Sequence, residues 1–246
     1  MQLVKLDGAA NFRDIGGYIT EDGRRIQSGR VFRSDHLGEL SSDDWERVLS
    51  LNIALVADLR NDAERKFWPC SWPESDNLNY LSLDYELDLD QLSEIGYQML
   101  AYKQIPLMRR FFAILAEGSP PVALVHCTAG QDRTGFVCAL LMHLLGVPKQ
   151  QILEDYVLSF YLRKDVVIDP ARVEQMATFY GMDVDIREFD GPPTETVKER
   201  ADHALTRMEE AILKIEEDFG SLDHFIEDEL LVDGSMTASI RSNLLV

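Results

Sequence analysis

The sequence predicts one α/β domain with a central, mostly parallel sheet of four or five strands and helices on both faces. Two observations support this fold class. Short apolar runs are interspersed with longer segments whose apolar residues recur every three to four positions, as expected of strands and helices. The 246 residues are also enough for one well-filled core, and they contain no repeat and no low-complexity linker. We therefore expect residues 1–246 to form a single domain.

The first third of the chain predicts three strands and one helix. Residues 29–34 form a short strand, and residues 41–52 form a helix that Ser41 and Asp44 open with capping-box spacing. Residues 53–59 are an apolar run that ends in a charged pair, which is typical of a buried central strand. Residues 78–83 are another candidate strand.

The rest of the chain is predicted to be mostly helical around one further strand. Two helices, residues 91–105 and 107–116, are separated by Pro106. A strand over residues 122–125 precedes a helix over 134–145, which Gly146 and Pro148 end. The later helices cover residues 149–164, 171–180, 194–218 and 221–231, and a short one begins at Ser235.

The most informative segment joins the strand over 122–125 to the helix over 134–145. Residues 126–135 read HCTAGQDRTG, so an arginine follows the cysteine after five intervening residues, and Thr-Gly follows the arginine. A strand, a tight loop and a helix start direct backbone N–H groups and the helix dipole at one point. This arrangement is a cradle for an oxyanion with a thiol at its base. The alternative, a structural cysteine at a strand end, leaves the spacing and the arginine unexplained.

The residue types in this loop favour phosphoryl transfer to sulfur and then to water. A helix N-terminus and a nearby cation favour the thiolate of Cys127, the form that attacks phosphorus. Arg133 offers a planar fork of donors to two phosphate oxygens, and the hydroxyl of Thr134 is a candidate donor to the sulfur. The other predicted substrate-binding residues, which line the loop, are Thr128, Ala129, Gly130 and Gln131.

The loop resembles the active-site loop of the cysteine-dependent phosphatases, the protein tyrosine and dual-specificity superfamily. Residues 11–18 (NFRDIGGY), 29–35 (GRVFRSD), 56–60 (VADLR) and 219–222 (FGSL) resemble the bacterial and fungal tyrosine phosphatases in particular. The resemblance covers nearly the whole chain, although residues 85–103 and 166–193 match none of its motifs. It implies hydrolysis of phosphate monoesters through a phosphocysteine intermediate, with no metal and no organic cofactor.

One departure from that family bears on the substrate. The family loop reads HC-x-x-G-K-D-R-T-G, and its lysine, which favours polyanionic substrates such as phosphoinositides, is Gln131 here. The loss of this charge favours a phosphotyrosine protein, with phosphoserine or phosphothreonine as further substrates. The alternatives are a phosphatase of phosphoinositides or other phosphorylated small molecules and a module that binds phosphotyrosine without hydrolysing it. The intact Cys127 and Arg133 argue against the last of these.

The general acid is left with two candidates. Asp132 lies inside the loop, where it resembles an aspartate of the myotubularin-type phosphatases that is proposed to protonate the leaving group. Asp84 follows the strand over 78–83, where the bacterial group has an acid that overhangs the pocket. Asp88 and Asp90 lie nearby, and residues 84–105 are a candidate lid.

The arginines at positions 13, 33 and 60 stand beside aspartates at predicted strand ends. We expect Arg13, Arg33 and Arg60 to form local ion pairs that hold the N-terminal segment against the sheet. The other interpretation places one or more of them at the rim of the pocket.

Composition and charge narrow the range of possible binding partners and cellular compartments. A net charge of −19 without a basic cluster argues against nucleic acid and anionic membrane surfaces. No apolar run approaches ~20 residues, so we expect no membrane insertion. The three cysteines fit neither a disulfide framework nor a metal site, and the N-terminus lacks a signal-peptide pattern. These features predict a cytoplasmic protein, with export by a route that needs no signal peptide as the alternative. The sequence does not indicate an oligomeric state.

Overall fold

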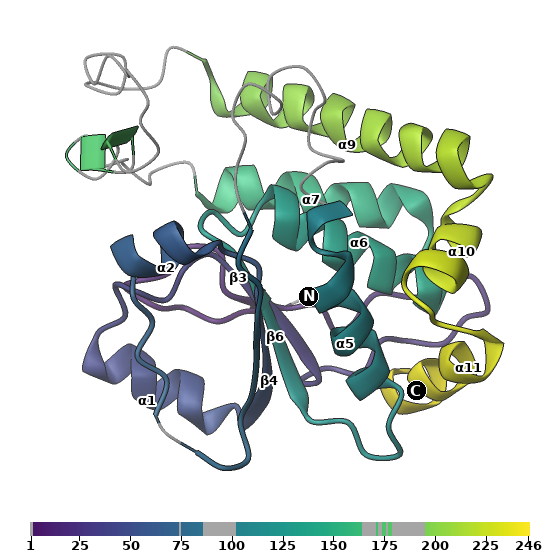
Figure 1. The fold of residues 1–246 in the computed structure, drawn as a ribbon, viewed down its shortest axis with the longest axis horizontal. Helices are drawn as coiled ribbons and strands as arrows, with labels where there is room; N and C mark the ends of the chain where they lie inside the picture. The colour runs from purple at the N-terminus through teal and green to yellow at the C-terminus, as the bar shows by residue number, and fades with distance from the viewer. Residues whose placement is uncertain are drawn as a thin grey trace.

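A computed structural model describes residues 2–73, 75–85, 102–163, 171, 174–175, 177–178 and 195–246. Its centre is a sheet with helices on both faces (Figure 1). Helices α1 (Ser42–Ser50) and α2 (Asp62–Phe67) cover one face, and α5 (Ile105–Leu115), α6 (Asp132–Leu145) and α7 (Lys149–Leu162) cover the other. The long helix α9 (Val197–Phe219) packs on the outer side of α7. The α/β class is thus confirmed.

The sheet has six strands in the order β1-β2-β3-β6-β4-β5. Their bounds are β1 Gln2–Leu3, β2 Arg13–Asp14, β3 Val31–Ser34, β4 Ile53–Asp58, β5 Asn79–Ser82 and β6 Val122–His126. The last four run parallel to one another, whereas β1 and β2 form an antiparallel edge, in which β2 pairs antiparallel with both β1 and β3. The expected four or five strands are therefore too few, because two-residue strands leave no apolar run in the sequence.

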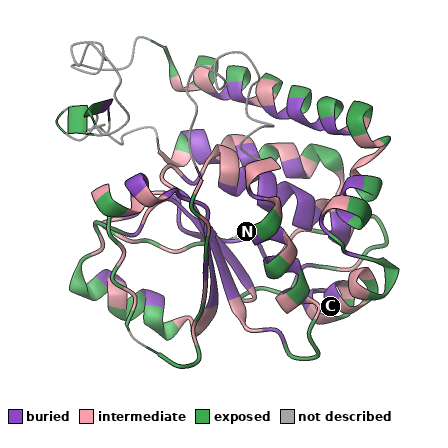
Figure 2. Cartoon of the chain, in the orientation of Figure 1, coloured by how far each residue is buried: buried purple, intermediate pink, exposed green. Residues whose placement is uncertain are grey.

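Strand β6 lies between β3 and β4 and contacts both layers of the core. Leu124 packs on one face with Phe12, Phe32 and Val48, while Ala123 and Val125 pack on the other with α6. This division follows from the period of two along a strand. The central strands β3, β4 and β6 are largely buried (Figure 2). The carboxyl end of β6 is therefore a fixed point in the middle of the sheet.

Most predicted helices are present. The capping box of Ser41 and Asp44 opens α1, and Gly146 ends α6 with a φ of 84°. Two short C-terminal elements, α10 (Leu222–His224) and the π-helical turn η2 (Phe225–Glu229), replace the single helix expected over 221–231, and α11 (Gly234–Leu244) follows them. Pro106 lies in the first turn of α5, where its missing N–H costs nothing, and a turn at Gln104 separates α5 from the helical residues 102–103 before it.

Two predicted segments fall largely outside the described residues, namely the helices over 91–105 and 171–180. Helix α2 was not predicted, because its six residues are too short to show a period. In the part of the chain that the structure describes, none of the helices combines the length and the apolar character needed to span a bilayer.

Candidate active site

The predicted cradle lies at the carboxyl end of β6. The strand ends at His126, and α6 begins at Asp132, so residues 127–131 form the loop between them. Neighbouring segments hold this loop on both sides. Leu59 N–H donates to the His126 carbonyl at 2.8 Å, and His36 N–H donates to the Thr128 carbonyl at 3.1 Å. We call residues 127–133 the phosphate loop.

Gly130 makes the tight turn of the phosphate loop. Its φ is 65°, and a Cβ at this position would lie 2.5 Å from the carbonyl oxygen of Ser34. Its N–H donates to Sγ of Cys127 at 3.2 Å, and its carbonyl accepts from Arg33 and Asn11, each at 2.8 Å. Only glycine fits here, because a side chain would meet backbone that cannot move away.

The nucleophile candidate lies at the base of this loop. Cys127 is 2% exposed, and the Gly130 amide points at its sulfur. Thr134 is fully buried, but its hydroxyl has no hydrogen-bond partner among the described residues. The expected hydrogen bond from Thr134 to the sulfur is thus not formed in this structure, and a backbone amide donates to the sulfur instead.

Arg133 is held by a carboxylate across the loop. Its Nη1 and Nη2 donate to the two carboxylate oxygens of Glu64 at 2.6 Å each. Nη1 also lies 2.7 Å from the Tyr85 hydroxyl and 3.2 Å from the Leu59 carbonyl. Burial alone would lower the pKa of Arg133, but the Glu64 carboxylate raises it above its usual value.

The two hydrogen bonds to Glu64 leave one edge of the Arg133 guanidinium available to a ligand. Among the described residues, Nε–H of Arg133 has no hydrogen-bond partner, and Nη2 uses one of its two hydrogens on Glu64. These two N–H groups form the side-on fork that binds two oxygens of a phosphate. Glu64 therefore orients Arg133 without blocking the edge needed for an oxyanion.

Glu64 was missed in the sequence. Asn61 N–H donates to its Oε2 at 3.0 Å, and its own N–H donates to the Asn61 side chain at 2.9 Å, in a capping box that opens α2. The Thr128 hydroxyl donates to its Oε1 at 2.6 Å. Burial opposes ionisation of Glu64, but Arg133 holds its pKa below the usual value. The available signal was the spacing Asn61-x-x-Glu64 directly after a buried strand.

Asp132, one candidate acid, is bonded to α7. The Tyr156 hydroxyl donates to its Oδ1 at 2.6 Å. The ring of Tyr156 occupies the space beside Gly135, where a Cβ would lie 2.4 Å from a ring carbon. Burial raises the pKa of Asp132 above its usual value, although Tyr156 and the nearby Arg207 and Arg133 oppose this effect. The environment thus shifts the pKa of Asp132 toward that of a general acid.

Asp84, the other candidate, points away from the loop. Its side chain is 74% exposed and forms an ion pair with Arg65. The next residue, Tyr85, reaches the site through the contact of its hydroxyl with Arg133. Asp88, Asp90 and residues 86–101 of the candidate lid lie outside the described residues. Gln131 is half-buried at the mouth of the loop.

The three strand-end arginines are all buried in ion pairs, as expected, but only one pairs locally. Arg60 binds Asp58 at 2.6 Å. Arg13 and Arg33 both bind Asp155 of α7, so the prediction of local partners is wrong for these two. Their neighbour Asp14 instead accepts backbone N–H groups of Gly16 and Gly29, each at 2.7 Å.

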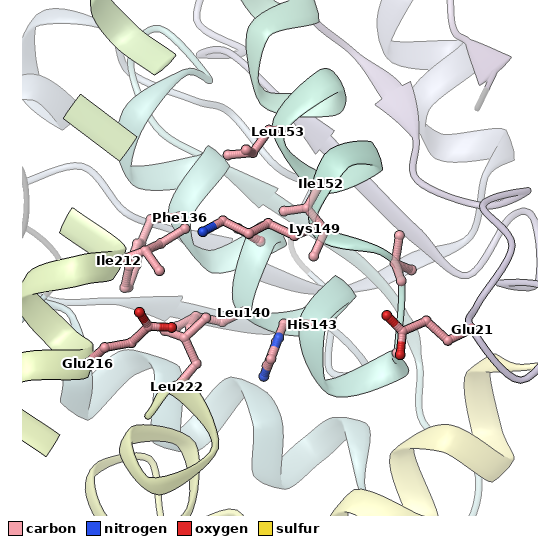
Figure 3. Close-up of a pocket in the computed structure, with 13 residues that line it drawn as sticks. Glu21, Phe136, Leu140, His143, Lys149, Ile152, Leu153, Ile212, Glu216 and Leu222 are labelled. Atoms are coloured by element: carbon pink, nitrogen blue, oxygen red, sulfur yellow. The ribbon is translucent and has the colours of Figure 1, made fainter. Parts of the chain in front are cut away.

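A separate cavity of about 260 Å³ opens between α6, α7 and α9 (Figure 3). Phe136, Leu140, Ile152 and Ile212 line it, with Lys149 and Glu216 among the charged residues at its edge. It shares no residue with the phosphate loop and contains no cysteine. We therefore place the candidate active site at the phosphate loop.

The chain is similar to several known phosphatases. The chain is 27% identical to a putative tyrosine-protein phosphatase of Cupriavidus necator, over 98% of this chain and 88% of the relative. It is 26% identical to the triple specificity protein phosphatase PtpB of Mycobacterium tuberculosis, over 93% of this chain and 94% of the relative. A tyrosine-protein phosphatase of Nostoc commune is 32% identical over 54% of this chain and 49% of its own length. The model of the tyrosine phosphatase family matches residues 4–246, and the chain therefore belongs to that family of hydrolases.

Proposed function

We propose that the protein hydrolyses phosphotyrosine through a phosphocysteine intermediate formed on Cys127. The observation that supports this most directly is the arrangement of the phosphate loop. A buried thiol lies under the Gly130 amide, and an arginine that Glu64 holds by two hydrogen bonds lies in the first turn of the helix beside it. The thiol, the loop amides and the guanidinium of Arg133 are the groups that nucleophilic attack on phosphorus requires.

In the first step, Sγ of Cys127 attacks the phosphorus in line with the scissile P–O bond. The S–P bond forms as the P–O bond breaks, and the leaving phenolic oxygen takes a proton from a carboxylic acid. The amides of the loop and the free edge of Arg133 stabilise the charge on the equatorial oxygens.

In the second step, water attacks the phosphorus of the phosphocysteine. The same carboxylate, now ionised, takes a proton from this water, and the S–P bond breaks to release inorganic phosphate and the thiolate. Thiolate departure is favoured by the N–H of Gly130, which lies 3.2 Å from the sulfur.

Asp132 is the acid that the local environment favours, because burial raises its pKa above that of an ordinary aspartate. Asp84 is the alternative, since only one exposed ion pair with Arg65 holds its side chain away from the loop. Leaving-group dependence separates the two. Replacing the true acid with asparagine should slow phenyl phosphate about 10²–10³-fold, while an activated aryl phosphate with a weakly basic leaving group is slowed far less. The variant of the other aspartate should show no such dependence.

Phosphotyrosine is the proposed substrate because the loop carries Gln131 in place of a lysine, which removes one positive charge from the mouth of the site. A relative whose name specifies triple specificity keeps a wider range of phosphate esters under consideration. Hydrolysis of a phosphoinositide headgroup by the same chemistry is the second candidate.

The test is hydrolysis of a phosphotyrosine peptide, a phosphothreonine peptide and a soluble phosphoinositide in reductant. We expect the phosphotyrosine peptide to be preferred and Cys127→Ser to abolish turnover of all three while phosphate binding persists. Cys70→Ser is the matched control and should keep activity, because Cys70 is half-buried outside the loop. Full activity of Cys127→Ser would overturn the covalent mechanism. Preference for the inositide would overturn the substrate assignment alone, and tight binding without turnover would indicate a binding module.

A further inference from the structure

Behind the phosphate loop lies a buried cluster of three charges, which we call the back cluster: Arg13, Arg33 and Asp155. None of the three side chains is more than 1% exposed. Nε of Arg13 donates to Oδ1 of Asp155 at 3.1 Å, and Nη1 of Arg33 donates to Oδ2. The hydroxyl of Ser159 lies 3.0 Å from Arg13 and 3.1 Å from Arg33. One carboxylate thus serves two guanidinium groups.

The back cluster carries a surplus positive charge. Arginine stays protonated in proteins, and two cations face one anion here. Burial and the neighbouring Arg33 lower the pKa of Arg13, as expected where two guanidinium groups crowd one carboxylate. Tyr18 adds a neutral hydroxyl donor to Asp155 at 3.1 Å, which does not change the balance. A buried surplus charge is costly unless an anion lies near it.

Most other charges around Cys127 are balanced by partners of their own. Arg133 pairs with Glu64 across the loop, Arg60 pairs with Asp58 behind β4, and Arg163 at the end of α7 pairs with Asp35 after β3. Each of these three pairs contributes no net charge. The back cluster therefore differs from all three.

Burial shifts the remaining titratable groups near the nucleophile toward their uncharged forms. Burial lowers the pKa of His126 in β6 to about 4, and burial raises the pKa of Cys138 in α6 to about 11. Burial also raises the pKa of Asp132, the first residue of α6, and raises the pKa of Tyr85 to about 12. Tyr156 of α7 is a phenol bonded to Asp132. The back cluster is thus a source of net positive charge beside the loop.

The back cluster also sets the direction of the loop amides. Nη2 of Arg33 and Nδ2 of Asn11 donate to the Gly130 carbonyl, and the same Asn11 nitrogen lies 3.4 Å from the Ala129 carbonyl. Because the carbonyl and N–H of a trans peptide point in opposite directions, pulling these carbonyls backward directs the following N–H groups forward. One of these, Gly130 N–H, contacts the sulfur.

We propose that the back cluster is a positioning element whose surplus charge stabilises the anion in the phosphate loop, first the Cys127 thiolate and then the bound phosphate. This inference rests on the proposed function, in which Cys127 is the nucleophile. It assigns Arg33 and Arg13 a role in the electrostatics of the site although neither has to touch the substrate.

The test measures alkylation of Cys127 by iodoacetamide against pH, followed at this residue by peptide mass spectrometry. Burial raises the pKa of Cys70 to about 11, so this half-buried thiol competes little near neutral pH. Arg33→Gln removes the charge and keeps an amide donor toward Gly130. It should move the midpoint of alkylation up by about one pH unit and slow the reaction about tenfold below the midpoint. Arg33→Lys keeps the charge and should restore most of the wild-type midpoint.

Two further variants separate charge from structure. Arg13→Gln should shift the midpoint in the same direction by less, because Arg13 makes no hydrogen bond to the phosphate loop among the described residues. Asp155→Asn removes the only anion of the cluster and should shift the midpoint down. A purely structural role predicts the same direction for Arg33→Gln and Asp155→Asn, since both loosen the loop. That result, or an unshifted Arg33→Gln, would overturn the proposal.

Folding and function are checked separately. The exposed pair of Arg24 and Asp22 provides the control Arg24→Gln, which should leave the midpoint unchanged. Circular dichroism identifies any variant that fails to fold, and Arg13→Gln still decides the question if Asp155→Asn is lost. Alkylation needs no substrate turnover, so a protein that hydrolyses nothing could still show the shifts. An active phosphatase without the shifts would refute the back cluster alone.

Discussion

The phosphate loop has arginines on two sides, and the two sides are built differently. In front, Arg133 faces Glu64 one to one, with 12% and 5% of their side chains exposed. Behind, Arg13 and Arg33 share Asp155, and all three side chains are within 1% of full burial. The front pair is balanced and borders the open mouth of the loop. The back cluster is unbalanced and sealed into the core.

The difference separates two tasks. The front arginine has to present its free edge to an arriving phosphate, so a neutralising partner that orients it is useful. The back arginines are buried behind the loop, where Arg33 holds the Gly130 carbonyl and the cluster keeps its net positive charge. Removing one partner of a buried pair leaves the other charge uncompensated, which is usually the largest cost of such a change. Substitutions in the front pair and in the back cluster should therefore impair the protein in different ways.

The largest effect on activity is expected for Glu64→Gln, which alters the partner of Arg133 in the front pair. The amide of glutamine points a donor at the guanidinium and leaves Arg133 without its carboxylate, so the fork loses its orientation. We expect kcat/KM to fall about 10²–10³-fold, which is about 3–4 kcal/mol of transition-state stabilisation. Steady-state kinetics with an aryl phosphate measures this loss.

The matched control lies on the same helix. Asp62→Asn breaks only the exposed pair with Lys66 and should change kcat/KM by less than about twofold. An equally small loss in Glu64→Gln would mean that Arg133 is oriented by other contacts, and the division between front and back would fail.

A second prediction concerns His126, which is buried without charge, whereas the back cluster stays charged. Burial lowers its pKa from 6.5 to about 4, so between these values the unfolded chain takes up a proton that the folded chain does not. Stability is therefore present above about pH 6.5 and is lost as the pH falls, by about 3 kcal/mol over the whole window. His126→Asn should remove most of this slope.

Urea unfolding at about pH 7 and about pH 4.5 measures that slope. At about pH 4.5 the unfolded chain also begins to protonate carboxylates whose pKa is lowered in the folded protein, such as Glu64 and Asp155, but the wild type and His126→Asn share this contribution. The difference between the two pH values is compared, so a general packing loss in the variant cancels. A slope equal to that of the wild type would show that His126 is not the group responsible.

The third prediction concerns the tight turn at Gly130 in the phosphate loop. Gly130→Ala adds a Cβ 2.5 Å from the Ser34 carbonyl oxygen at a φ of 65°. We expect a loss of about 2 kcal/mol in the free energy of unfolding, because backbone on both sides has to shift. Gly118→Ala is the control, since no atom lies within 4 Å of its added Cβ. Equal stability of the two variants would contradict the crowding seen at Gly130.

How far the sequence could predict this site follows from the distance of each contact along the chain. The phosphate loop is local, so one strand, ten residues and one helix were sufficient to place Cys127 and Arg133 together. Arg60 and Asp58 are also local, and their pairing was predicted. Glu64, Tyr156 and Asp155 reach the loop or its supports from 24 to 142 positions away, and such contacts leave no spacing to recognise.

Asp155 nevertheless left a signal. It lies between Ile152, Tyr156 and Phe160 in α7, all of them buried. An acid on the core face of a helix needs a buried cation, and the sequence has several arginines in apolar strands. The pairing with Arg13 and Arg33 could therefore have been considered before their neighbouring aspartates, whose carboxylates bind backbone N–H groups instead.

The smallest effect is expected for Tyr156→Phe, which tests whether Asp132 is the general acid. The Tyr156 hydroxyl stabilises the ionised form of Asp132, so its removal raises the pKa of this carboxyl further. If Asp132 donates the proton to the leaving group, the basic limb of the kcat profile moves to higher pH. The plateau should change by less than about threefold, because nucleophile and phosphate loop are untouched. An unchanged basic limb would exclude Asp132 as the group that sets it and would direct attention to Asp84, which makes no contact with Tyr156 among the described residues.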